Sequence, residues 1–204
     1  MSSLRVDIYS GKEHLDATAK EAIISGLAEF GSVARLDLLL RHIPGCGKLD
    51  QRKIVVDKLP LEELLGGKLN ILVGNFALHN NLAGSYFGEG FVFLNPTTLA
   101  SKSLAVVSRP ATALRIATAH ETAHALGFVT PERSQTAHCR SEGCIMQSSL
   151  GSLSLKPDSG YSDVWSGVVP IHDGRRAIVP DNATFCEPCV NEISEHTEQH
   201  IQAL

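Results

Sequence analysis

Two histidines and a glutamate near the middle of the chain are the strongest candidates for chemistry. His120, Glu121 and His124 form the pattern His-Glu-x-x-His. On a helix, residues four apart lie on one face a turn apart, so both imidazoles can reach a single metal ion. The carboxylate of Glu121 then lies on the flank of that face, beside a metal-bound water. Because Zn²⁺ lowers the pKa of such a water toward about 7, a neighbouring carboxylate can accept its proton, which is chemistry for amide hydrolysis.

Four of the five cysteines form a second candidate metal site. Cys139 and Cys144 are separated by four residues, and Cys186 and Cys189 are separated by two. Two such pairs are typical of tetrahedral zinc sites with four thiolate ligands. An odd number of cysteines, in a chain that shows no secretory signal, argues against a full disulfide framework. Cys46 is left over, and we interpret it as a structural or free thiol.

The segment from Pro110 to Leu126 is predicted to be the helix that carries the histidine motif. Ser108 precedes it as a candidate cap, Pro110 falls in the first turn, and Gly127 follows at the exit. A glycine there lets the chain reverse with a positive φ. A third metal ligand on the returning segment requires such a reversal.

The elements that must position this helix are predicted from hydrophobic periodicity. Leu4, Val6 and Ile8 alternate with polar residues, as in a half-buried strand. A helix with one apolar face should follow, with Gly31 just past its end. Further strands are expected at Val33–Leu40, Leu69–Val73, Gly90–Leu94 and Leu104–Ser108, and a last helix from Cys189 to the end of the chain. Residues 53–66 are ambiguous, and we interpret them as extended, followed by a short helix after Pro60.

Composition limits the classes of partner. The chain has 204 residues, 43% hydrophobic and 20% charged, which suits one globular domain with no membrane-spanning segment. A net charge of −4 with scattered Lys and Arg disfavours nucleic acid as a partner. We expect a single cytoplasmic domain over residues 1–204, monomeric, with the sheet and histidine helix in 1–127 and a C-terminal subdomain in 128–204.

Three motifs follow one another in the chain. They are His120-Glu121-x-x-His124-x-x-Gly127, then His138-Cys139-x₄-Cys144-x-Met146, then Cys186-x-x-Cys189. Their order resembles the signature of the archaemetzincins, a metzincin-like family of zinc peptidases. The resemblance implies two zinc ions: a catalytic one held by His120, His124 and His138, and a structural one held by the four cysteines. It also implies that Met146 forms the Met-turn, an apolar floor beneath the catalytic zinc.

The resemblance further implies a fold and a way of binding substrate. The fold expected is α+β and metzincin-like: a twisted, mostly parallel mixed sheet of about five strands, packed on a backing helix and an active-site helix. An irregular C-terminal part would carry the Cys₄ zinc. A peptide would lie extended along an edge strand containing Val106 and Val107, pairing backbone to backbone.

The third ligand of the catalytic zinc is where the chain departs from the family pattern. Thr130 stands where the shorter metzincin motif has its third histidine, and ten residues separate Gly127 from His138. The longer loop costs about 1.4 kcal/mol of closure entropy. Cys139, fixed by the structural zinc, would offset this by holding His138 in place. Other candidates for the third ligand are Glu132, Glu142 and His172.

A long gap after Met146 and a second histidine pair also bear on the resemblance to this family. The gap of 39 residues from Met146 to Cys186 exceeds the family's and suggests an inserted loop around Tyr161–Ile178. The last helix carries a second histidine pair, His196 and His200, but without a glutamate directly after the first. We interpret that pair as part of a solvated face.

The sequence therefore predicts a zinc-dependent metallopeptidase that hydrolyses a peptide or protein substrate, with Glu121 as general base. The alternative is a non-catalytic zinc-binding interaction protein that retains the metzincin scaffold. Glu121 speaks against that alternative, because a pure scaffold needs no carboxylate at that position. Nucleic-acid binding through the cysteine cluster is disfavoured by the charge balance.

Overall fold

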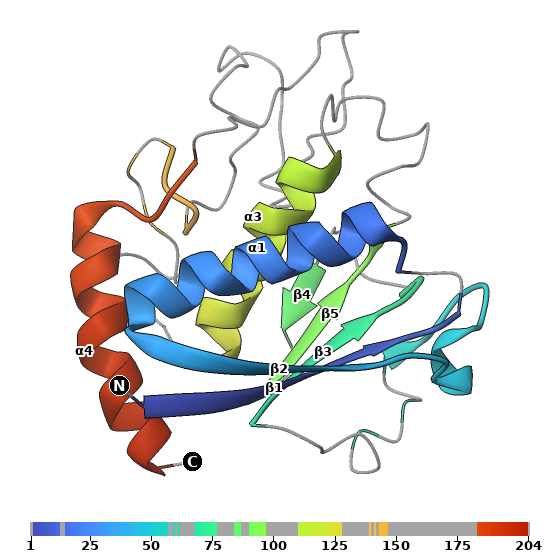
Figure 1. The fold of residues 1–204 in the computed structure, drawn as a ribbon. Helices are drawn as coiled ribbons and strands as arrows, with labels where there is room; N and C mark the ends of the chain where they lie inside the picture. The colour runs from blue at the N-terminus through green and yellow to red at the C-terminus, as the bar shows by residue number, and fades with distance from the viewer. Residues whose placement is uncertain are drawn as a thin grey trace, which may run out of the picture.

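A mixed sheet with helices on one face organises the part of the chain that the structure describes (Figure 1). The computed structural model describes residues 2–12, 15–56, 59, 61, 68–76, 84–86, 90–96, 110–127, 139, 141, 143–146 and 183–203. Its elements are β1 (Ser2–Ser10), α1 (Ala17–Ala34), β2 (Leu36–Ile43), η1 (Gly47–Leu49), β3 (Leu69–Val73), β4 (Gly84–Tyr86), β5 (Phe91–Leu94), α3 (Pro110–Ala125) and α4 (Glu187–Ala203). The fold class is α+β, as predicted.

The described residues form a five-stranded sheet in the order β2-β1-β3-β5-β4. All neighbouring pairs are parallel except β4 and β5, which are antiparallel. The expectation of a mostly parallel mixed sheet is therefore confirmed. The prediction of strands at the start of the chain, at Leu69–Val73 and near Gly90–Leu94 is also confirmed, whereas β4 was not predicted. The strand expected at Leu104–Ser108 lies outside the described residues.

Alternation along the strands divides the apolar side chains between two faces. Leu4, Val6 and Ile8 of β1 face α1 and α3 and belong to the larger core cluster. Tyr9 and Leu72 face the other way and pack in a second cluster with residues of the segment after β2. Helix α3, which carries the histidines, therefore packs directly against the sheet face of Leu4, Val6 and Ile8 (Figure 1).

The boundary between α1 and β2 was predicted wrongly. We expected the helix to end at Gly31 and a strand to begin at Val33, but α1 continues to Ala34 and β2 begins at Leu36. Arg35, with φ 55°, makes the left-handed turn instead, and its N–H donates to the carbonyl of Gly31. The glycine serves packing: a Cβ at position 31 would lie 3.1 Å from the side chain of Leu38.

The crossing of α1 over α3 is close at Gly26. A Cβ there would lie 2.9 Å from Cβ of Thr118 and closer still to the backbone oxygen of Arg115. We predict that Gly26→Ala lowers the free energy of unfolding by roughly 2 kcal/mol, because overlap with backbone outweighs the gain in helix propensity. Urea unfolding measures this. Gly47→Ala is the matched control, since a Cβ at Gly47 meets no heavy atom within 4 Å, and an equal loss there would contradict the packing argument.

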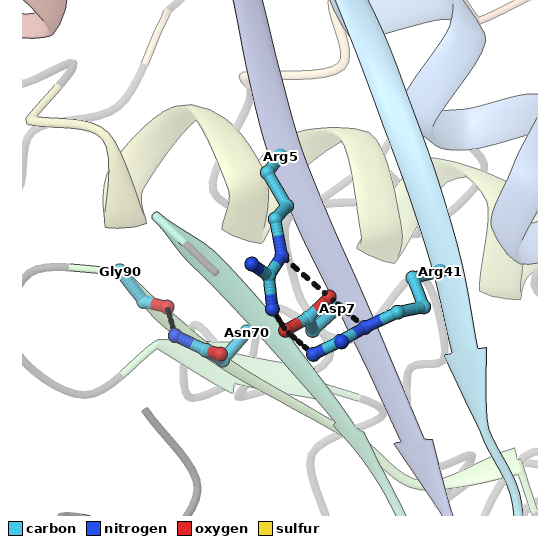
Figure 2. Close-up of polar contacts among 5 residues, drawn as sticks. All are labelled: Arg5, Asp7, Arg41, Asn70 and Gly90. Atoms are coloured by element: carbon cyan, nitrogen blue, oxygen red, sulfur yellow. Dashed lines mark hydrogen bonds and ion pairs between the residues drawn. The ribbon is translucent and has the colours of Figure 1, made fainter. Parts of the chain in front are cut away.

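A buried carboxylate lies on the sheet face opposite α1 and α3. Asp7 of β1 is fully buried and is flanked by Arg5 and Arg41, whose side chains are 48% and 53% exposed. Arg41 Nε and Nη2 donate to the two carboxylate oxygens at 2.9 and 2.6 Å, and Arg5 donates to the same oxygens at 3.3 and 3.1 Å (Figure 2). Beside them, Asn70 Nδ2 donates to the carbonyl of Gly90 at 3.4 Å (Figure 2). Burial alone would raise the pKa of Asp7, but the hydrogen bonds and charges of Arg41 and Arg5 outweigh it and lower that pKa.

The lowered pKa of Asp7 predicts a pH-dependent stability. A carboxylate with a depressed folded-state pKa stabilises the fold above its unfolded pKa, and this contribution is lost as the pH falls through the folded pKa. We expect Asp7→Asn to lower the free energy of unfolding by about 1–2 kcal/mol at pH 7, with a smaller difference below about pH 4. Urea unfolding at both pH values measures it. The exposed Glu21→Gln on α1 should show neither effect, and a pH-independent loss in Asp7→Asn would refute the ionic origin.

Candidate functional site

Helix α3 brings the two predicted metal-binding histidines together. His120 and His124 are 1% and 5% exposed, and their Nε2 atoms lie 3.0 Å apart. Their rings meet edge to face, with centroids 4.6 Å apart. The helix predicted from Pro110 to Leu126 is confirmed, and Gly127 at its exit has a φ of 82°, as the predicted reversal requires.

The distance between the two nitrogens can be tested against a metal ion. Two nitrogens each about 2.0–2.1 Å from a tetrahedral zinc are about 3.3–3.4 Å apart. The observed 3.0 Å is within a few tenths of this value, so a small outward movement of either ring would accommodate the ion. Imidazole nitrogens are among the usual ligands of zinc. The donor pair therefore fits a zinc ion, to which it would contribute two ligands.

A backbone carbonyl fixes which nitrogen of His120 can bind a metal. His120 Nδ1 lies 2.8 Å from the carbonyl oxygen of Ile145. Because a carbonyl can only accept, Nδ1 carries the proton and Nε2 is left with its lone pair. Such contacts orient metal-binding histidines in proteins. Sequence reasoning missed this partner, since a backbone carbonyl leaves no signal in residue type.

Glu121 lies next to the first histidine and is 5% exposed. A carboxylate buried to this degree is costly unless it has polar partners or a functional reason. Glu121 lies on α3 directly after the first of two buried histidines, as the His-Glu-x-x-His pattern predicts. The helix thus provides two imidazoles and one carboxylate in a setting shielded from bulk water.

The four predicted cysteine ligands converge on one point. The sulfur atoms of Cys139, Cys144, Cys186 and Cys189 all lie within 4.8 Å of one another. Two of the distances, Cys139 to Cys186 and Cys144 to Cys189, are 3.6 Å. Four sulfurs about 2.3 Å from a tetrahedral zinc are about 3.8 Å apart, so the cluster fits one such ion. Cys46 lies elsewhere, in the segment after β2, where its N–H donates to the carbonyl of Ser10.

Backbone N–H groups point at two of these sulfurs. Ser141 N lies 3.3 Å from Cys139 Sγ, and Cys186 N lies 3.4 Å from Cys144 Sγ. The side-chain hydrogen bond between Cys144 and Cys189 is the largest of the effects that lower the pKa of Cys144 to about 7, and the same contact raises the pKa of Cys189. Backbone N–H donors such as those of Ser141 and Cys186 favour the thiolate form of a cysteine, which is the form that binds metals.

The cysteine cluster and the histidine pair are joined by one short segment. Ile145, whose carbonyl contacts His120, directly follows Cys144, and its N–H donates to Thr184 O at 3.0 Å. Thr184 N donates in return to Gly143 O at 3.3 Å. Met146 is 1% exposed in the core cluster that includes residues of α3, and its carbonyl accepts from Cys139 N at 2.7 Å.

Helix α3 also contacts the segment that leads to the second cysteine pair, Cys186 and Cys189. Arg115 Nη2 donates to the carbonyl of Ala183 at 3.2 Å, and the same guanidinium pairs with Glu29 of α1. Burial raises the pKa of Glu29, and the charge of Arg115 opposes this. Arg115 therefore ties the segment that leads to Cys186 to both helices.

Several predicted site residues lie outside the described residues. They are the third ligand His138, its alternatives Glu132, Glu142 and His172, the edge-strand residues Val106 and Val107, and the predicted insertion at 161–178. On α4, His196 is exposed, as expected for a solvated face, whereas the side chain of His200 lies outside the described part of the chain.

Among the described helices, none combines the length and the apolar character needed to cross a membrane. A search with protein-family models finds no match to this chain, and a search of curated proteins also finds none.

Proposed function

We propose that this protein is a zinc-dependent metallopeptidase of the archaemetzincin kind. The observation that carries the proposal is the 3.0 Å distance between the Nε2 atoms of His120 and His124 on α3. Glu121, which directly follows His120 in the sequence, is buried as well. A catalytic zinc bound there would acidify a coordinated water and polarise the carbonyl of the scissile bond. The metzincin-like fold is part of this proposal.

The protein's own residues would act around that zinc in defined ways. Glu121 accepts a proton from the attacking water as general base and donates it to the leaving amine as general acid. His120 presents Nε2 because the Ile145 carbonyl holds the proton on Nδ1. Burial of both histidines excludes bulk water, which strengthens electrostatic interactions at the reacting bond.

We propose His138 as the third ligand. It directly precedes Cys139, whose N–H donates to the carbonyl of Met146 at 2.7 Å and whose sulfur belongs to the cysteine cluster. Cys139 is thereby held close to the loop that contacts His120. A residue adjacent to such an anchor has little conformational freedom to lose when it binds a metal.

We propose that a second zinc binds the four cysteines and has a structural role. Sulfur distances of 3.6 Å and N–H donors to two sulfurs support this assignment. A peptide substrate would pair with an edge strand of the sheet, for which Val106 and Val107 remain our candidates. Among the described strands, β4 is the edge that contacts α3.

Metal content and peptide cleavage test the proposal together. We expect two zinc ions per chain by elemental analysis of purified protein, and cleavage of members of a broad peptide library that stops when a chelator removes zinc. Two zinc ions without cleavage of any peptide would instead support the non-catalytic zinc-binding protein. A metal content of one zinc that survives His120→Ala unchanged would contradict the catalytic centre.

A further inference from the structure

Strand β2 is one edge of the described sheet, and five of its eight residues are apolar. The described residues pair β2 only with β1, which leaves its other side without a strand partner among them (Figure 1). Leu39 is 53% exposed and Leu40 is 39% exposed. The strand Leu36–Ile43 contains neither Pro nor Lys, two residues that commonly protect exposed edges from pairing, and its charged side chains are Asp37 and Arg41.

The sequence of β2 is complementary to itself when two copies run antiparallel. A two-fold axis perpendicular to the sheet keeps the helices of both copies on one side, so residues that lie opposite each other must share a face. When the axis passes through Leu39, that residue lies opposite its own copy. Asp37 then lies opposite Arg41 of the second copy, and Leu38 lies opposite Leu40.

This register places opposite charges in direct cross-strand pairs. Asp37 is exposed, and it shares the sheet face of Leu39 and Arg41 by alternation. The exposed Arg41 already pairs with Asp7 through two of its five N–H donors (Figure 2). Arg5 also pairs with the carboxylate of Asp7, so Arg5, Asp7 and Arg41 together carry a net positive charge at this edge. That charge would attract Asp37 of a second copy.

We propose that this protein forms a symmetric dimer in which two β2 strands pair antiparallel about Leu39 and join the two sheets. The occupant of the open edge is therefore a second copy of the chain. The proposal replaces the expectation of a monomer and is independent of the metal centres. Two neighbouring registers also keep the helices of both copies on one side of the sheet. The register with the axis at Leu38 places Asp37 opposite Leu39, and the register with the axis at Leu40 places Asp37 opposite Ile43. In both, Asp37 no longer lies opposite Arg41.

Sedimentation velocity over a range of protein concentrations tests whether the dimer forms. We expect a concentration-dependent monomer–dimer equilibrium for the zinc-loaded wild type. Leu39→Asp places two like charges opposite each other at the axis and should weaken association by roughly tenfold or more. Circular dichroism and zinc content should match the wild type. A wild type that stays monomeric throughout, or a dimer of undiminished affinity in Leu39→Asp, would overturn the proposal.

Cysteine cross-linking tests the register. Opposed residues of antiparallel strands have Cα atoms about 4.5–5.5 Å apart, within the range of a disulfide. Leu39→Cys should therefore give a disulfide-linked dimer under mild oxidation. Leu40→Cys is the matched control, because in this register position 40 lies opposite position 38. Equal cross-linking of both variants would rule out pairing about Leu39.

Discussion

Replacing Glu121 by glutamine should reduce the rate of peptide cleavage by about 10²–10⁴-fold while leaving the zinc content unchanged. Glutamine has nearly the same shape but cannot accept a proton, so the variant loses the base and keeps the packing of α3. At 5% exposure, no bulk water replaces the carboxylate at this position. Single-turnover cleavage of the best library peptide, together with elemental analysis for zinc, gives both quantities.

A matched control separates this effect from a general loss of stability. Glu195→Gln makes the same chemical change at an exposed position of α4 and should cleave at the wild-type rate. Thermal unfolding of both variants should resemble that of the wild type. Undiminished cleavage by Glu121→Gln would mean that another group takes the proton, and the proposed role of Glu121 would have to be abandoned.

Periodic apolar patterns predicted the main elements because each element has one buried face. The alternation of Leu4, Val6 and Ile8 and the helical pattern before Gly127 reflect contact with one core, and the structure has β1 and α3 at these places. The three-residue strand β4 was missed, since two residues on one face cannot establish a period of two. Gly31 misled the prediction of the α1 end because a helix-stopping glycine and a close-packed glycine look alike in sequence.

The candidate site was predictable to the extent that it depends on side-chain chemistry. The spacing of His120, His124 and the four cysteines predicted which atoms would converge, and the described residues bring both sets together. The connection between them could not be predicted. It depends on the backbone groups of Ile145 and Thr184, which every residue type offers equally.

If zinc binds at both sites, as proposed, that connection would couple the two metal centres thermodynamically, and Cys144→Ser should expose the coupling. A serine hydroxyl is not ionised at neutral pH, so the variant should lose the structural zinc, with a drop of several kcal/mol in the free energy of unfolding. Because Ile145 directly follows residue 144 and holds His120, we also expect the affinity of the histidine centre for zinc to fall by about 10–100-fold. Linkage requires the converse effect to be of equal size.

Cobalt substitution would distinguish the two proposed centres, because only the cysteine centre would give thiolate-to-metal charge-transfer absorption. Titrating Cys144→Ser with Co²⁺ should show this band only at higher Co²⁺ concentration than in the wild type, because three thiolates remain, together with a weakened histidine centre. Cys46→Ser is the matched control, since Cys46 lies in the segment after β2, away from both centres, and its removal should change neither. A histidine centre of wild-type affinity in Cys144→Ser would show that the Thr184 and Met146 contacts hold the Ile145 carbonyl without metal. In that case the backbone hydrogen bonds of Cys139, Ile145 and Met146, rather than the thiolate site, would position His120.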